Sequence, residues 1–107
     1  MIEYEEGSGN VYADLGLPDA EEMLVKAQLA IKITQIIQAR EWTQQDAAKV
    51  LNMTQPMLSN MMRGRFRGIS EAKMLECLAK LGCDVQIVVG PAREPNYAGR
   101  VEVVCAA

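Results

Sequence analysis

The sequence predicts a mainly α-helical domain that ends in one or two short β-strands. Half of the 107 residues are hydrophobic but only 5% are aromatic, and this composition favours a helical core over a sandwich of sheets. Apolar residues recur at helical spacing up to Leu81, and after Gly82 the segment Cys83–Val89 carries Val85, Ile87 and Val89 at alternate positions. A chain of this length is expected to fold as one domain without disulfides or a metal.

Residues 1–18 are expected to form an irregular acidic arm, because glycines, Pro18 and acidic residues interrupt any periodic pattern. The arm either frays or becomes ordered on a partner or on its own domain. Residues 19–90 are the expected helical domain, and residues 91–107 are expected to be a linker and a terminal strand that forms a dimer.

A long helix is expected to begin at Pro18-Asp19, where acidic side chains favour the positive end of the helix. Its predicted apolar face consists of Met23, Leu24, Ala27, Ala30, Ile31, Ile33, Ile36 and Ile37. Its other side is predicted to carry Lys26, Lys32, Gln35 and Gln38. The first turns exceed what is needed to brace the next two helices, so we expect them to serve a dimer or a partner protein.

The segment 43–64 predicts two short helices joined by a tight corner. Thr43 and Thr54 can each accept a hydrogen bond from an amide in the first turn of the helix that follows. Pro56 fits the first turn of the second helix, and Asn52 tolerates the left-handed conformation that a corner needs. The pair is a helix-turn-helix motif, whose second helix can lie in the DNA major groove.

The remaining elements follow from apolar spacing and from glycine. The inward faces of the two short helices are predicted to be Ala47, Ala48, Val50, Leu51, Leu58 and Met61, with Ala48 at the closest approach. Gly64 is expected to end the second helix, and Phe66 to anchor the loop that follows. Ser70 is expected to cap a fourth helix over Glu71–Leu81, which Gly82 stops.

Two strands are predicted after Gly82, over Cys83–Val89 and Arg100–Cys105, with the polar linker Ala92–Gly99 between them. Exposed edges of such strands usually find a partner. Pairing with the same strand of a second copy would give a two-fold homodimer, which matches a palindromic DNA site.

The net charge of −3 is unevenly distributed along the chain. Residues 1–22 contain seven acidic and no basic residues, whereas the remainder contains eleven basic and seven acidic residues. Residues 52–69 contain three arginines and no acid. A phosphate within a Debye length of about 8–10 Å would therefore meet positive charge at the motif.

These patterns predict a set of contacts with double-stranded DNA. The outward face of the second helix offers base contacts, through Gln55, Met57 and Asn60. The flanking residues offer phosphate contacts, through Gln44, Thr54, Ser59, Arg63, Arg65 and Arg67. Each of these side chains could instead be an ordinary solvated polar residue.

Other function classes find little support in the sequence. There is no histidine, no glycine-rich phosphate loop and no metal-ligand cluster, so neither an enzyme nor a cofactor is expected. The three cysteines, Cys77, Cys83 and Cys105, are expected to be reduced thiols. No apolar run reaches membrane-spanning length and no signal peptide is visible, so a cytoplasmic protein is expected.

The motif resembles the XRE family, the Cro and phage-repressor type of helix-turn-helix. The resemblance rests on Gln44, Ala48, Leu58 and Gly64 within residues 43–64, followed by the helix 70–82. It covers roughly residues 11–90 and extends to small antitoxin-type members related to the HigA class, through the first helix, the loop MRGRFRGIS and the segment LGCDVQIVV. Asn52 departs from the glycine that the family usually has, and Pro56-Met57 replaces polar base-reading residues.

The resemblance implies a lambda-repressor-like helical bundle and a homodimeric transcriptional repressor that binds an operator. For the antitoxin subgroup it also implies a small RNA-cleaving toxin of the RelE/HigB type as partner. Two alternatives remain open at this point. One is a stand-alone repressor, and the other is a protein-interaction module without DNA binding.

Overall fold

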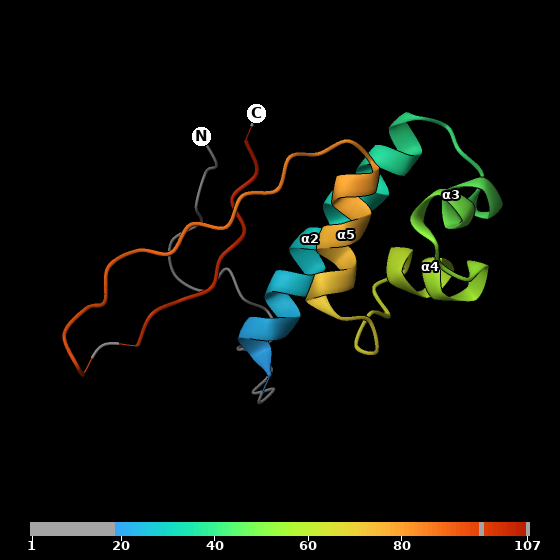
Figure 1. The fold of residues 1–107 in the computed structure, drawn as a ribbon. Coiled ribbons are helices and arrows are strands. Elements are labelled where there is room, and N and C mark those ends of the chain that lie inside the picture. Colours follow the sequence, from blue (N-terminus) through green and yellow to red (C-terminus); the bar gives the residue numbers. More distant parts are fainter. Residues whose placement is uncertain (1–18, 97, 107) are drawn as a thin grey trace.

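A computed structural model describes residues 19–96 and 98–106, and the predicted acidic arm over 1–18 lies outside them. Within the described residues the chain forms four helices, shown in Figure 1: α2 (Ala20–Ala39), α3 (Gln44–Leu51), α4 (Gln55–Met62) and α5 (Glu71–Lys80). The prediction of a mainly helical domain is confirmed.

The long helix α2 and the helix α5 pack against each other and carry the shorter pair (Figure 1). The helix α4 contacts both α2 and α3, and α3 also contacts α5. All four helices therefore contribute to one core. Its largest fully buried side chains are Ile33, Ile37, Leu51, Leu58, Met61, Met74 and Cys77. Burial of such side chains holds the short helices, which would be marginal alone.

Local capping signals start each helix after α2. The hydroxyl of Thr43 accepts from the amide of Asp46 at 3.1 Å, and that of Thr54 accepts from Met57 at 3.2 Å. The hydroxyl of Ser70 accepts from the amide of Lys73 at 3.1 Å. The three predicted caps are therefore confirmed, and each satisfies an amide that has no partner within its helix.

The predicted faces of the helices are correct for most residues but wrong for three. Lys26 was expected on the polar side of α2 but is only 5% exposed, whereas Ile31 is 56% exposed. Lys26 lies on the same side of the helix as the buried residues Ala30, Ile33 and Ile37. Its long aliphatic chain is buried, and its ammonium lies at the edge of the core. Val50 on α3 was also expected inward and is exposed.

The predicted strands over 83–89 and 100–105 are wrong. The chain after α5 is extended: it leaves the helices, reverses near residue 96 and returns (Figure 1), but residues 84–96 and 101–106 form no backbone–backbone hydrogen bond with any described residue. Alternating β-branched residues favour an extended backbone, yet a strand exists only when a second one pairs with it. No described segment supplies that pairing.

Candidate nucleic-acid interface

The corner between α3 and α4 fixes the direction in which α4 points. Asn52 adopts the left-handed conformation, with φ 53° and ψ 48°, and its amide donates to the carbonyl of Lys49. The amide of Met53 donates to the carbonyl of Ala48 at 2.9 Å. The sharp reversal that the sequence predicts at Asn52 is therefore present, and it turns the first residues of α4 outward.

The helix α4 has one buried face and one exposed face. Leu58 and Met61 are fully buried, while Gln55 and Met57 are exposed and Asn60 is half-buried. Met57, Asn60 and Arg63 follow one another at intervals of three and so lie along one stripe of the helix surface. The three predicted base-contacting residues are thus brought to the face that points away from the core.

A hydrogen bond links Asn60 to the predicted phosphate-contacting Arg63. Nη2 of Arg63 donates to Oδ1 of Asn60 at 3.3 Å. A bidentate contact with adenine uses both the oxygen and the nitrogen of an asparagine amide. Asn60 therefore has to share or release Arg63 when it reads a base, whereas Gln55 carries no such bond among the described residues.

Gln44, Thr54 and Ser59 are the other predicted phosphate-contacting residues on α3 and α4. Gln44 is the first residue of α3 and is partly exposed next to the free amides of that helix end. Thr54 is exposed, and its hydroxyl oxygen already caps α4, which leaves the hydroxyl proton for a phosphate. Ser59 is half-buried one turn after Gln55. Gln44 and Thr54 thus lie at helix N-termini and Ser59 lies on α4, and all three are at least partly exposed.

The loop after α4 is shaped by Gly64. Its φ of +84° allows the amide of Arg65 to donate to the carbonyl of Asn60 at 2.7 Å, and its own amide to donate to Met61 at 3.1 Å. These two bonds form a Schellman motif, the glycine-dependent helix ending. Phe66 is then buried, with 3% of its surface exposed, as predicted, and Arg65 is left exposed without an ion pair among the described residues.

Arg67 differs from the other two arginines because an acid holds it. Its Nη1 forms an ion pair with Oδ2 of Asp19, the residue before α2, and its carbonyl accepts from the ammonium of Lys26 at 3.1 Å. Lys26 is paired in turn with Glu22 at 3.3 Å. These bonds join the loop to the start of α2. Arg67 therefore has to leave the carboxylate of Asp19 if it binds a phosphate.

Comparison with known proteins agrees with this geometry. A sequence profile described as a helix-turn-helix domain matches residues 11–90. A solved structure described as an XRE family transcriptional regulator is 32% identical, covers 83% of this chain and 100% of its own, and superposes with a TM-score of 0.74. The chain belongs to the XRE-type helix-turn-helix family. None of the curated proteins matches the chain.

Some features of this XRE-type chain escaped the sequence analysis. The burial of Lys26 could have been found from its spacing to Ala30 and Ile33, but the pairing of Asp19 with Arg67 joins residues that are 48 positions apart and leaves no local signal.

Within residues 19–96 and 98–106, no cluster of acidic, cysteine or histidine side chains could hold a metal ion. No described helix is both long and apolar enough to cross a membrane.

Proposed function

We propose that the chain is a sequence-specific DNA-binding transcriptional regulator that acts as a repressor. The observation that carries the proposal is the capped α3–α4 pair, which presents Gln55, Met57 and Asn60 beside an arginine loop that contains no acid. Membership in the XRE-type family supports the same function.

Two substitutions separate base reading from phosphate binding. Gln55→Ala is expected to relax sequence preference, since it removes a bidentate contact worth about 1–3 kcal/mol of discrimination. Arg65→Ala is expected to weaken binding to every duplex and to reduce the salt dependence by about 0.9 in the slope of log K against log salt. Gel-shift titrations at two salt concentrations measure both, using a site selected from a random duplex library with the wild-type protein.

The alternative reading, a protein-interaction module without DNA binding, predicts different results. Such a module would select no site from the library, and Gln55→Ala would leave its weak affinity for every duplex unchanged. Lys49→Ala is a useful control, because Lys49 is exposed on α3 outside the predicted contact set and carries the same charge as Arg65. A larger effect of Lys49→Ala than of Arg65→Ala would contradict the assigned phosphate contacts.

We infer that the regulator is a homodimer joined through the chain after α5. This extended segment carries six exposed large hydrophobic residues, Val85, Ile87, Val88, Val89, Val101 and Val104. The backbone groups of residues 84–96 and 101–106 form no backbone–backbone hydrogen bond with any described residue. An exposed apolar segment whose backbone is not paired with the described part of the chain is the kind of edge to which a second chain adds.

The finer role, an antitoxin that neutralises a RelE/HigB-type toxin and represses its own operon, is supported by the resemblance to HigA-class proteins. The exposed side of α2 around Ile31 adds a surface on which a partner could pack. Co-expression with the neighbouring small basic reading frame is the test. Rescue of growth and co-purification support the antitoxin, whereas the absence of such a frame favours a stand-alone repressor.

A further inference from the structure

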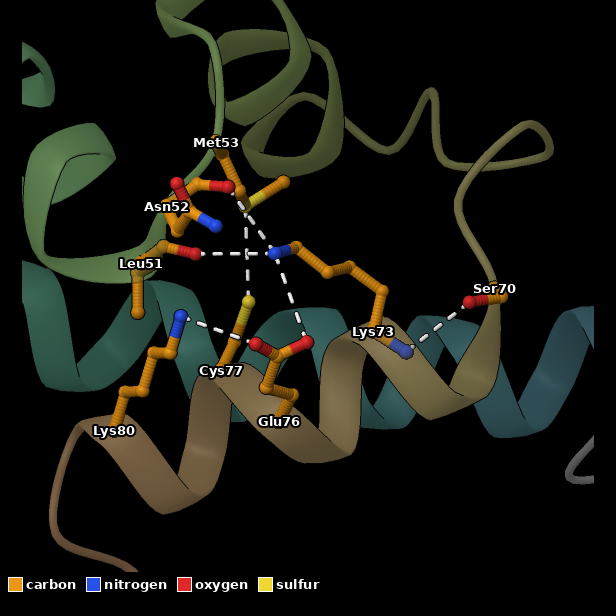
Figure 2. Close-up of polar contacts among 8 residues, drawn as sticks. All are labelled: Leu51, Asn52, Met53, Ser70, Lys73, Glu76, Cys77 and Lys80. Atoms are coloured by element: carbon orange, nitrogen blue, oxygen red, sulfur yellow. Dashed lines mark hydrogen bonds and ion pairs between the residues drawn. The ribbon is translucent and has the colours of Figure 1, made fainter.

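A polar cluster on α5 holds the corner between α3 and α4 (Figure 2). The ammonium of Lys73 donates to the carbonyl oxygen of Leu51 at 3.3 Å and to that of Asn52 at 3.1 Å. Leu51 is the last residue of α3 and Asn52 is its left-handed cap. One side chain of α5 therefore binds both residues at which the chain turns towards α4.

The two carbonyls that Lys73 binds have no other donor among the described residues. The carbonyls of Ala48 and Lys49 accept from the amides of Met53 and Asn52, but those of Leu51 and Asn52 lie past the last helical amide. A positive charge at this place also suits the negative end of α3. The side chain of Lys73 is only 23% exposed and its bond to Leu51 is partly buried, so water screens that bond less than the exposed bond to Asn52.

Lys73 is itself fixed on α5. Its amide is capped by Ser70 at 3.1 Å, and its ammonium lies 3.7 Å from a carboxylate oxygen of Glu76. Lys80 binds the same carboxylate at 3.1 Å from the other side. The hydrogen bond from Lys80 and the charge of Lys73 lower the pKa of Glu76, which keeps this carboxylate ionised. The ammonium is therefore held in place between Glu76 and the corner.

Few other polar contacts join the corner to the rest of the molecule. Among the described residues, the hydrogen bonds from the corner to α5 involve only Lys73 and Cys77, whose Sγ lies 3.7 Å from Sδ of Met53. Burial raises the pKa of the Cys77 thiol, so this sulfur contact stays neutral and weak. The direction of α4 thus depends on apolar packing and on Lys73.

We propose that Lys73 is a positioning residue for DNA recognition, which fixes the corner so that Gln55 and its neighbours meet the bases in one orientation. The proposal rests on the proposed DNA-binding function. Base reading tolerates displacements of only about half an ångström, because a bidentate contact needs both atoms in place. Phosphate contacts by flexible arginines tolerate more. Loss of the hydrogen bonds from Lys73 to the corner therefore lowers sequence discrimination more than it lowers general affinity for DNA.

Lys73→Met and Lys80→Met form a matched pair for the test. Both remove one positive charge from α5 and one partner from Glu76, but only Lys73 touches the corner. Binding is measured by fluorescence anisotropy on a duplex selected by the wild-type protein and on a random duplex. We expect Lys73→Met to lower the ratio of selected to random affinity by about tenfold, the effect of one or two lost hydrogen bonds, and Lys80→Met to leave the ratio unchanged. Lys73→Arg, which keeps charge and donors, is expected to restore most of it.

Equal ratios for the two methionine variants, measured on folded protein, would overturn the proposal, as would an equal loss on both duplexes. Circular dichroism checks the fold. If Lys73→Met unfolds, the pair Lys73→Gln and Lys80→Gln replaces the methionine pair, because glutamine keeps a polar head group and destabilises the fold less. The affinity ratio is again expected to fall for the Lys73 variant and not for the Lys80 variant, by a smaller factor. Equal ratios in this pair also overturn the proposal. Failure of the wild-type protein to select any duplex would instead contradict the proposed function.

Discussion

At the scale of single residues, the three arginines of the α4–α5 loop differ in what each must give up to bind DNA. Arg65 has no ion pair among the described residues, Arg63 holds the side chain of Asn60, and Arg67 is paired with Asp19. A phosphate gains most from a cation that has no partner to lose. Arg65 should therefore contribute most to general affinity, and Asp19 should limit the contribution of Arg67.

Replacing Asp19 by asparagine tests this competition. We expect Asp19→Asn to strengthen binding to every duplex and to steepen the salt dependence by up to about 0.9 in the slope of log K against log salt, because Arg67 becomes available to a phosphate. Gel shifts at several salt concentrations measure the slope. The cap of α2 is little affected, since the side chain of Asp19 makes no capping hydrogen bond.

Glu21→Gln is the matched control, because it removes the same charge from the first turn of α2 without touching Arg67. A gain of equal size in both variants would mean that net charge alone acts. The combination of Asp19→Asn with Arg67→Gln should bind no better than Arg67→Gln alone. A gain that survives in this background would contradict the competition.

At the scale of elements, α3 contributes a small buried side chain next to the corner that leads to α4. Ala48 is 4% exposed and its carbonyl accepts from the amide of Met53 at the corner. We expect Ala48→Leu to lower the free energy of unfolding by about 1–3 kcal/mol, because overpacking forces the two helices apart. Denaturant unfolding measures the change. Ala72→Leu, at an exposed position of α5, should alter it by less than about 0.5 kcal/mol.

The elements also show which kind of information a sequence holds. The caps at Thr43, Thr54 and Ser70 were predictable because each depends on residues within one helical turn. The glycine at position 64 was predictable for the same reason. The strands after Gly82 were predicted wrongly, because alternation reports an extended backbone and says nothing about a partner.

For the candidate interface, the sequence predicted which residues face outward but not the bonds that hold them in position. Helical spacing placed Gln55, Met57 and Asn60 outward, and the structure has them on the exposed side of α4. The bonds that tie this surface to the rest of the molecule were not visible, because Asp19 with Arg67 and Lys73 with Asn52 are distant in the sequence. The first pair forms only when the loop after α4 packs against the start of α2, and the bond from Lys73 to the backbone carbonyl of Asn52 forms only when α5 packs against α3.

At the scale of the whole molecule, the helices α3 and α4 and the apolar extended chain after α5 lie at opposite ends of the helical body (Figure 1). Val103 of the returning segment packs against the core beside α2, while Ile87 and Val89 are 76% and 88% exposed. A dimer formed by the segment that contains Ile87 and Val89 would hold two α4 helices at a fixed separation without covering either of them. This is the arrangement that a palindromic site requires.

Lysines on the extended segment test the dimer without disturbing the fold. We expect Ile87→Lys with Val89→Lys to raise the dimer dissociation constant by more than about tenfold, because paired apolar edges exclude charged side chains. Sedimentation equilibrium measures the mass, and thermal unfolding of the monomer should stay close to normal, since both side chains are exposed. Ala92→Lys, in the exposed linker, is the control and should leave the dimer intact. Affinity for a palindromic duplex should fall with the dimer while affinity for a half-site stays. A dimer that survives both lysines would place the dimer contact outside this segment. A wild-type protein that is monomeric at micromolar concentration would contradict the dimer itself.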